Sequence, residues 1–296
     1  MGNTLYRRKA ARQGLSKITR YFVNRYLHLV AQRHHAHGFP QMAVFSHDHI
    51  GHLINLDGRY EEDHLQAAMG WLRQQLGETK DRIALDIGAN IGNHAVFFSQ
   101  FFRSVHAVEP NPRTYQLLRF NAGNVGNVIA HQLGLSDAAA VGALHENPTN
   151  IGGTYINLEA DEGLSVSLET LDDFAVRNQL DAVALIKIDT EGFEARILRG
   201  AKNVIAAYMP VIMFELSPSD FSADGSSEVV SLLMKQGYNF VTVEQNFSSG
   251  GSLLGRAISY ALRTLFGDEY LVRPITAFEP KFYQMVIAVH SRIAPE

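Results

Sequence analysis

The chain has 296 residues, and its composition of 46% apolar and 19% charged residues is typical of a globular protein with ample material for a core. It contains no cysteine, which excludes disulfide bonds, a thiolate nucleophile and cysteine-based metal sites. No apolar run approaches the ~18 residues of a membrane-spanning helix, and no apolar signal segment follows the basic N-terminus, so we expect a cytoplasmic protein.

An N-terminal arm, residues 1–55, is predicted to precede a main domain of residues 56–296. The first 33 residues contain eight Lys or Arg and no acidic residue; since the whole chain carries −4, the remainder carries −12. Apolar residues recur at helical spacing from Leu15 to Leu29, which predicts a basic amphipathic helix. We expect it to pack on the body of the chain or on a second subunit, forming a homo-oligomer. Peripheral contact with an anionic membrane is the alternative.

Residues 34–64 are rich in histidine, with side chains at His34, His35, His37, His47, His49, His52 and His64. We expect His47 and His49 to share one face of a strand, where Asp48 or His52 could complete a metal site. The spacing is looser than in closed metal sites, and we therefore predict no metal. A turn at residues 56–60 is predicted to lead into a helix from near Glu61 to residue 76.

Residues 84–92 predict a short buried strand, a glycine turn and a helix that begins near Asn93. Gly88 allows a sharp turn, and Gly92 allows the helix to lie close to the sheet. The turn leaves N–H groups at a helix N-terminus, directed at a small molecule. The middle glycine of G-x-G-x-x-G, which admits a pyrophosphate, is absent. This favours a cofactor without a pyrophosphate, such as S-adenosylmethionine, although two glycines can also serve packing alone.

Strands and helices alternate after this turn, which is typical of a parallel sheet with helices on both faces. The predicted strands cover residues 104–109, 128–133, 182–189, 211–216, 238–243 and 283–290. The predicted helices begin at Asn111-Pro112 and Asp172-Asp173 and cover about 193–207 and 227–236. Between them, Pro148 and Gly152-Gly153 indicate small hairpins.

An insert, residues 244–280, separates the last two strands and holds a Ser/Gly-rich stretch at 248–252 and an amphipathic helix. If the last strand is antiparallel, the insert leaves and re-enters at the carboxyl edge of the sheet, where ligands bind in open α/β folds. The insert is therefore either a glycine-hinged lid or a surface helix on the sheet edge.

Acidic residues follow the first two strands of the sheet. Glu109 ends the second strand, where a carboxylate can accept hydrogen bonds from both hydroxyls of a ribose, and this predicts a nucleoside cofactor. Asp86 either orients the loop or the methionine part of the cofactor, or caps the turn. Ser136 and Asp137, after the third strand, either meet the adenine or are turn residues.

A second polar cluster follows the strand that ends at Asp189. Lys187 and Asp189 point to the same side of this strand, and a lysine within an apolar strand is costly unless it is paired. Asp189, Glu191 and Glu215 are available partners. The cluster predicts an active site, with a structural ion pair as the alternative, in which Glu191 and Glu194 stabilise a helix N-terminus.

The motifs D-I-G-A-N-I-G, V-E-P-N-P, L-D-D, K-I-D-T-E-G-F-E and L-R-G-A resemble those of the FkbM-family methyltransferases, over residues 58–216. The resemblance implies a Rossmann-like class I methyltransferase fold, an α/β architecture with a seven-stranded, mostly parallel sheet. It also implies S-adenosylmethionine as donor, and usually O-methylation of a hydroxyl on a sugar, glycan or natural product. It suggests cofactor contacts at Glu61, Asp86, Gly88, Asn90 and Glu109, and acceptor-side roles at Lys187, Asp189 and Glu191.

Methylation of a hydroxyl requires a base within hydrogen-bond reach. We predict Asp189 as the first candidate and Glu191 as the second, with Lys187 holding the carboxylates and Glu215 on the substrate side. The alternative is a non-catalytic cofactor-binding or scaffold protein. A NAD-dependent dehydrogenase is disfavoured by the missing glycine. A nucleic-acid methyltransferase is disfavoured because the body is acidic and lacks N/D-P-P-Y/F motifs.

Overall fold

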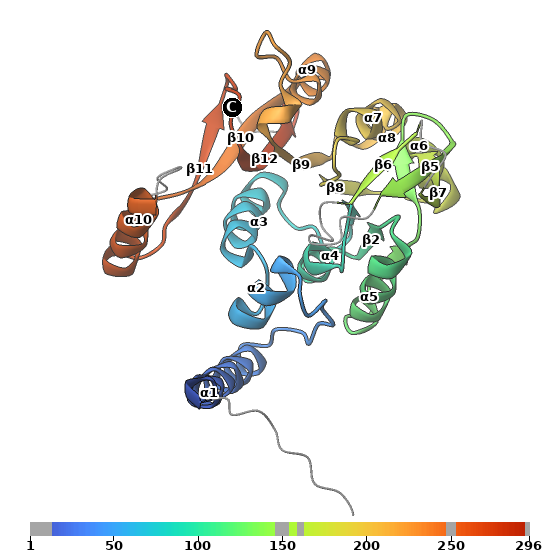
Figure 1. Cartoon of the computed structure of the whole chain (residues 1–296). Coiled ribbons are helices and arrows are strands. Elements are labelled where there is room, and N and C mark those ends of the chain that lie inside the picture. Colours follow the sequence, from blue (N-terminus) through green and yellow to red (C-terminus); the bar gives the residue numbers. More distant parts are fainter. Residues whose placement is uncertain (1–13, 146–153, 159–162, 247–252, 294–296) are drawn as a thin grey trace, which may run out of the picture.

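The computed structural model describes residues 14–145, 154–158, 163–246 and 253–293. An eight-stranded sheet in the order β11-β10-β12-β9-β8-β1-β2-β3 forms the centre, and a four-stranded sheet in the order β4-β7-β5-β6 lies beside it (Figure 1). The strands of the large sheet are β1 Ile83–Ile87, β2 Ser104–Val108, β3 Val128–His131, β8 Val183–Ile188, β9 Val211–Leu216, β10 Tyr238–Gln245, β11 Tyr270–Ile275 and β12 Tyr283–His290. Those of the small sheet are β4 Gly134–Ser136, β5 Ala140–His145, β6 Tyr155–Asn157 and β7 Leu164–Thr170.

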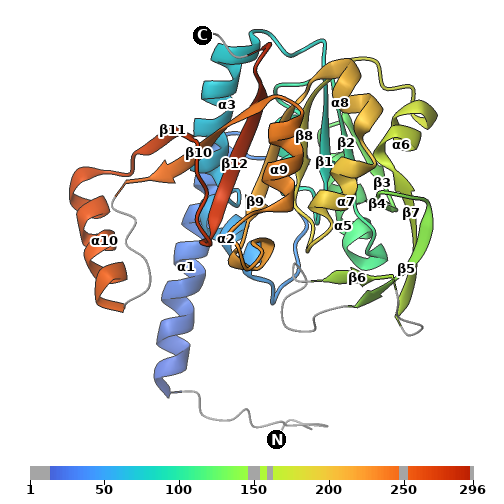
Figure 2. The ribbon, with the colours of Figure 1, turned by 90° about the horizontal axis from the view of Figure 1, so that it is seen from above.

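Helices cover both faces of the large sheet (Figure 2). Their bounds are α1 Gly14–Ala36, α2 His49–Asp57, α3 Glu62–Leu76, α4 Asn93–Phe98, α5 Pro112–Gly123, α6 Leu171–Arg177, α7 Glu194–Arg199, α8 Lys202–Tyr208, α9 Glu228–Lys235 and α10 Leu253–Phe266. Apolar side chains of α3, α4 and α5 pack on one face, and those of α6 to α9 pack on the other. The expected layering is confirmed.

The large sheet contains the seven predicted strands. β1, β2, β3, β8 and β9 are parallel to one another, and β12 runs antiparallel to both β9 and β10, as predicted. Strands β9 and β12 have the predicted bounds, 211–216 and 283–290. Their boundaries were readable because apolar residues dominate each strand, as expected for a strand buried on both faces.

The eighth strand, β11, was not predicted and lies within the 244–280 insert. It pairs antiparallel with β10, and its Tyr270 ring packs edge-on against His64 of α3 at 4.7 Å. In Figure 1, α10 and β11 lie beyond α3, on the far side from the small sheet. The described part of the insert thus extends one edge of the sheet. The predicted hinge, 248–252, lies outside the described residues, as do Pro148 and Gly152-Gly153.

The predicted helix 193–207 is divided into α7 and α8. Gly200 stands between them, and a Cβ there would lie 2.2 Å from the backbone oxygen of Ser136, so β4 passes too close for any side chain. The carboxylate of Asp172, in α6, accepts hydrogen bonds from the backbone N–H groups of Asn203, at 3.0 Å, and Val204, at 2.9 Å. It therefore caps the N-terminus of α8.

The strand predicted at His47 and His49 is absent, and helix α2 begins at His49 instead. Asp48 is the N-cap of α2, and its carboxylate accepts the N–H of Gly51 at 3.2 Å, so His47 and His49 do not share a strand face. The His52 ring is 3.0 Å from the carbonyl oxygen of Ser46. Within the described residues, no three His, Asp or Glu side chains are grouped so as to hold a metal ion.

Helix α1 projects from the body, and only its C-terminal end contacts α2 (Figure 2). Val30 is buried there, but seven large apolar residues of the helix are exposed: Ile18, Tyr21, Phe22, Val23, Tyr26, Leu27 and Leu29. The expected packing of its apolar face on the body of the same chain is therefore wrong. None of the described helices has the length and hydropathy of a membrane span.

Candidate active site

The glycine turn after β1 brings the two predicted motifs together. Gly88 has φ +76°, and a Cβ on it would lie 1.9 Å from the backbone oxygen of Asp189, so the loops after β1 and β8 touch at this glycine. A Cβ on Gly92 would lie 2.7 Å from Leu118 of α5. The absence of a side chain at Gly92 therefore allows α5 to lie close to the start of α4. The sequence had predicted that this glycine allows the helix to lie close to the sheet. Asn90, between the glycines, has φ +50°, a strained conformation for a side-chain-bearing residue.

Glu109 follows β2 and is buried. Its two carboxylate oxygens accept the backbone N–H groups of Asn90, at 3.0 Å, and Asn111, at 2.9 Å. Burial raises the pKa of Glu109 to about 7, although these two hydrogen bonds act to lower it. The carboxylate is thus fixed between the glycine turn and the start of α5, and it lines the cavity described below.

Lys187 is paired with two carboxylates. Its ammonium lies 2.9 Å from Asp189 Oδ2 and 3.5 Å from Asp86 Oδ1. Burial lowers the pKa of Lys187, but these two charges raise it more, so its pKa lies above the ordinary value and the side chain stays charged. Asp86 is fully buried, and neither of its oxygens has a hydrogen bond among the described residues. Lys187 is therefore the charge partner of Asp86.

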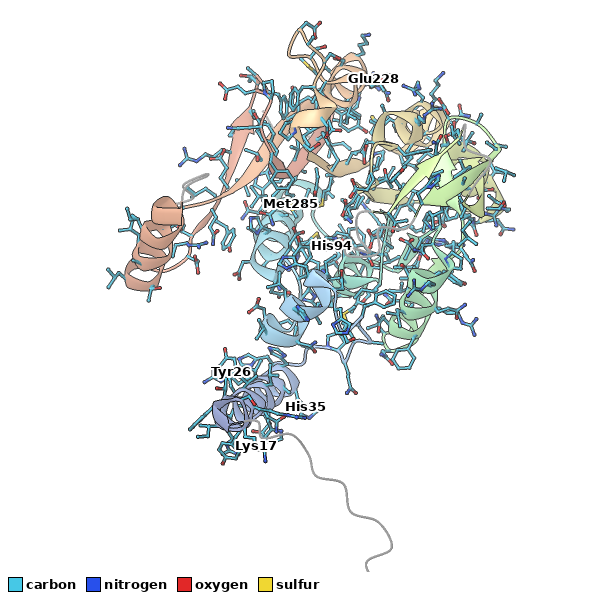
Figure 3. All side chains as sticks on the ribbon, in the orientation of Figure 1. Lys17, Tyr26, His35, His94, Glu228 and Met285 are labelled. Atoms are coloured by element: carbon cyan, nitrogen blue, oxygen red, sulfur yellow. The ribbon has the colours of Figure 1, made fainter. Side chains whose placement is uncertain are left out.

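Glu61 occupies a strained position directly before α3, with φ +60°. Its carboxylate accepts a hydrogen bond from Gln284 of β12 at 2.8 Å and pairs with the ring of His94 at 3.1 Å. Burial acts to raise the pKa of Glu61, but these contacts and the charge of Lys187 lower it to about 2. Glu61 and His94 line a small cavity next to Lys187 and Glu215. His94 and Met285 lie near the centre of the molecule in Figure 3.

Two further carboxylates face the same space as Asp189. Burial, followed by the charges of Asp189 and Glu61, raises the pKa of Glu215 to about 8. Burial and the charge of Asp189 also raise the pKa of Glu191. Carboxyl groups held close together in a partly dry site resist ionisation. Groups whose pKa is shifted in this way cluster at active sites.

A cavity of about 460 Å³ lies at the carboxyl ends of β1, β2 and β8. This is the size of a small-molecule site. One wall comes from α2, through His49 and Ile50, and another comes from the small sheet. Next to Glu109 the lining is apolar, with Pro110, Leu135, Leu144 and Ile156. The polar lining includes Tyr60, Asn90, Asn93, His94, Glu109, Lys187, Asp189, Thr190, Glu191 and Glu215.

Not every predicted residue reaches the cavity. Asp86 lies behind Lys187, and Gly92 packs on α5; neither lines the cavity. Ser136 is buried at the end of β4. Asp137 forms ion pairs with arginines of α7, at 3.2 Å to Arg196. Neither Ser136 nor Asp137 lines the cavity, and their contact with the adenine stays a prediction. The preceding residues, 134–135, line it instead.

The sequence interpretation missed Tyr60, His94 and Gln284. Tyr60 directly precedes Glu61, and this adjacency was the one available signal. Gln284 is 223 residues from Glu61 and lies in an apolar strand, so no local pattern indicates their hydrogen bond.

The fold and the site together define a class of protein. The mostly parallel sheet with the antiparallel strand β12 near its end, the glycine turn after β1 and the buried acid after β2 are those of a Rossmann-like methyltransferase. Residues 86–240, just over half of the chain, match the methyltransferase FkbM domain. The chain belongs to the FkbM methyltransferase family.

Three characterised proteins are similar to this chain. Hexuronic acid methyltransferase AglP of Haloferax volcanii is 28% identical over 45% of this chain and 56% of its own. The 31-O-demethyl-FK506 methyltransferase FkbM of Streptomyces tacrolimicus is 25% identical over 57% and 76%. The 2-O-methyltransferase NoeI of Sinorhizobium fredii is 26% identical over 43% and 60%. The chain thus spans little more than half the length of AglP and of NoeI.

Proposed function

We propose that the protein is an S-adenosylmethionine-dependent O-methyltransferase that modifies a hydroxyl of a sugar, glycan or natural product. The observation that carries this proposal is the Lys187–Asp189 ion pair, which lies on a cavity that also contains Gly88 and Glu109. The names of the similar proteins support the acceptor class, since they refer to a hexuronic acid, a natural product and a 2-O position.

The lining fits a nucleoside cofactor. Glu109 presents a buried carboxylate suited to ribose hydroxyls, and the neighbouring apolar wall, with Leu135, Leu144 and Ile156, suits an adenine. Asn90, in the glycine turn, would hold the polar end. Glu61 lines the smaller cavity with His94 and not this one, so its contact with the cofactor stays a prediction. When bound, S-adenosylmethionine supplies an electrophilic methyl group.

The residues of the chain then have separate tasks. Asp189 accepts the proton of the acceptor hydroxyl, and Lys187 holds the Asp189 carboxylate in place through the 2.9 Å pair. Glu191 is the second candidate base. Glu215, whose pKa is raised to about 8, holds a proton at neutral pH and can donate a hydrogen bond to the acceptor.

Cofactor binding is testable by thermal unfolding. We expect S-adenosylhomocysteine, at 100 times its Kd, to stabilise the protein by about 2.7 kcal/mol, and NAD to leave the melting temperature unchanged. Replacing Glu109 by Ala should remove most of this stabilisation, because the ribose loses its acceptor. Since the raised pKa of Glu109 keeps it protonated below about pH 7, affinity should also be lower at pH 6 than at pH 8. A rise in melting temperature with NAD but not with S-adenosylhomocysteine would contradict the proposal.

We also propose that α1 docks on an anionic membrane surface. Its exposed side chains combine aromatic residues such as Phe22 and Tyr26 with the cations Lys17, Arg20 and Arg25, a pattern of interfacial helices. Figure 3 shows Lys17 and Tyr26 on the projecting helix, apart from the body. Pairing of two α1 helices would place like charges together, whereas each cation near an anionic bilayer contributes about 1 kcal/mol.

Vesicle co-sedimentation tests this docking. We expect binding to vesicles that contain phosphatidylglycerol and none to pure phosphatidylcholine. Replacing Phe22 and Tyr26 together by Ser should weaken binding at least tenfold. Val176→Ser, which alters an apolar residue of α6 that is 80% exposed, is the matched control and should change nothing. Membrane docking would be refuted if the double variant bound these vesicles as tightly as the wild type. It would also be refuted by a dimer that forms without lipid and requires Phe22 and Tyr26.

A further inference from the structure

The charged groups around the cavity are strongly biased toward one sign. Four carboxylates line it, those of Glu109, Asp189, Glu191 and Glu215. Among the lining residues that the structure describes, Lys187 is the only Lys or Arg. Its ammonium is already engaged by Asp189, at 2.9 Å, and by Asp86, at 3.5 Å. This lining therefore leaves no uncommitted Lys or Arg for a negatively charged ligand.

The wall formed by the small sheet adds no positive charge. Residues 137–176, which include β5, β6 and β7, contain eight acidic residues and no Lys or Arg. The side chains from this wall that line the cavity are uncharged: Leu144, Thr154, Tyr155 and Ile156. Arg113, at the start of α5, lines a neighbouring groove together with Gly163.

The carboxylates also repel one another. Burial and the charge of Asp189 raise the pKa of both Glu191 and Glu215, which means that the site already resists further negative charge. Proteins that bind a carboxylate or phosphate usually place Arg or Lys against it, because an unpaired anion in a partly dry site is costly.

We infer that the acceptor carries no carboxylate, phosphate or sulfate beside the reacting hydroxyl, and that the site takes a neutral sugar or polyol or an amino sugar. This inference rests on the proposed function and narrows its acceptor class. The inferred acceptor therefore differs from a hexuronic acid, the acceptor that the name of AglP specifies.

The test uses three analogues of the proposed cofactor in which a hydroxypropyl, carboxyethyl or aminopropyl arm replaces the methyl group on sulfur. The adenosyl part anchors each analogue, and the arm probes the acceptor side. By calorimetry we expect the carboxyethyl analogue to bind at least tenfold more weakly than the hydroxypropyl analogue, and the aminopropyl analogue to bind no more weakly. Equal or tighter binding of the carboxyethyl analogue would overturn the inference. If S-adenosylhomocysteine and all three analogues fail to bind, the proposed function fails, and the inference with it.

Variants locate the cause of the discrimination. Replacing Glu191 by Gln should reduce the difference in affinity between the carboxyethyl and hydroxypropyl analogues at least threefold, because it removes a carboxylate from the lining of the cavity. Glu228→Gln is the control, because Glu228 is exposed on α9 (Figure 3) and does not line the cavity; it should leave the difference unchanged. Full discrimination in Glu191→Gln would show that this carboxylate does not select the acceptor, which would contradict the inference.

Discussion

Asp189→Asn should lower the rate of methyl transfer by about 10²–10⁴-fold, the usual contribution of a general base, and leave the affinity for S-adenosylhomocysteine within about twofold. Asparagine keeps the size of the side chain and can still contact Lys187, but it cannot take the proton of a hydroxyl. Lys187 also keeps its second partner, Asp86. The measurements are the release of S-adenosylhomocysteine during turnover and calorimetry of the resting protein.

The matched control is Asp181→Asn, at the opposite end of the same strand. Asp181 is exposed and pairs with Arg103, so the same chemical change there should leave turnover unaffected. Wild-type turnover in Asp189→Asn would assign the base to Glu191 and remove Asp189 from the proposal. A loss of cofactor affinity equal to the loss of rate would identify Asp189 as a cofactor-binding residue.

The sequence predicted the elements whose local pattern decides their structure. The strand 211–216 is apolar at almost every position, and Asn111 followed by Pro112 marks a helix start by capping and fixed φ; both are confirmed. The approach of Gly88 to Asp189 was also anticipated in outline, because strands aligned in a parallel sheet place their carboxyl ends at one edge.

The errors have a different origin, since they depend on contacts between distant residues. Gly200, between α7 and α8, lies so close to β4 that no side chain fits there, and Asp137 pairs with arginines of α7. Neither contact is visible in local sequence. The predicted strand at His47 and His49 failed for a local reason, because the capping preference of Asp48 outweighed the alternation of side chains.

Lys187→Met should destabilise the protein by about 3–5 kcal/mol, because it leaves the Asp86 carboxylate buried without a charge partner. Asp86 is fully buried and has no hydrogen bond to either oxygen among the described residues, so Lys187 supplies the compensation. The measurement is the free energy of unfolding from denaturant titration at pH 7.

The double variant Asp86→Leu with Lys187→Met shows whether the stability lost in Lys187→Met comes from the unpaired charge of Asp86 or from packing. Removing both charges eliminates the desolvated anion, so the double variant should recover most of the stability that the single variant loses. If the two losses simply add, Lys187 does not compensate Asp86. The stability lost in Lys187→Met would then come from packing, and the lysine would be retained for its action on Asp189 in methyl transfer.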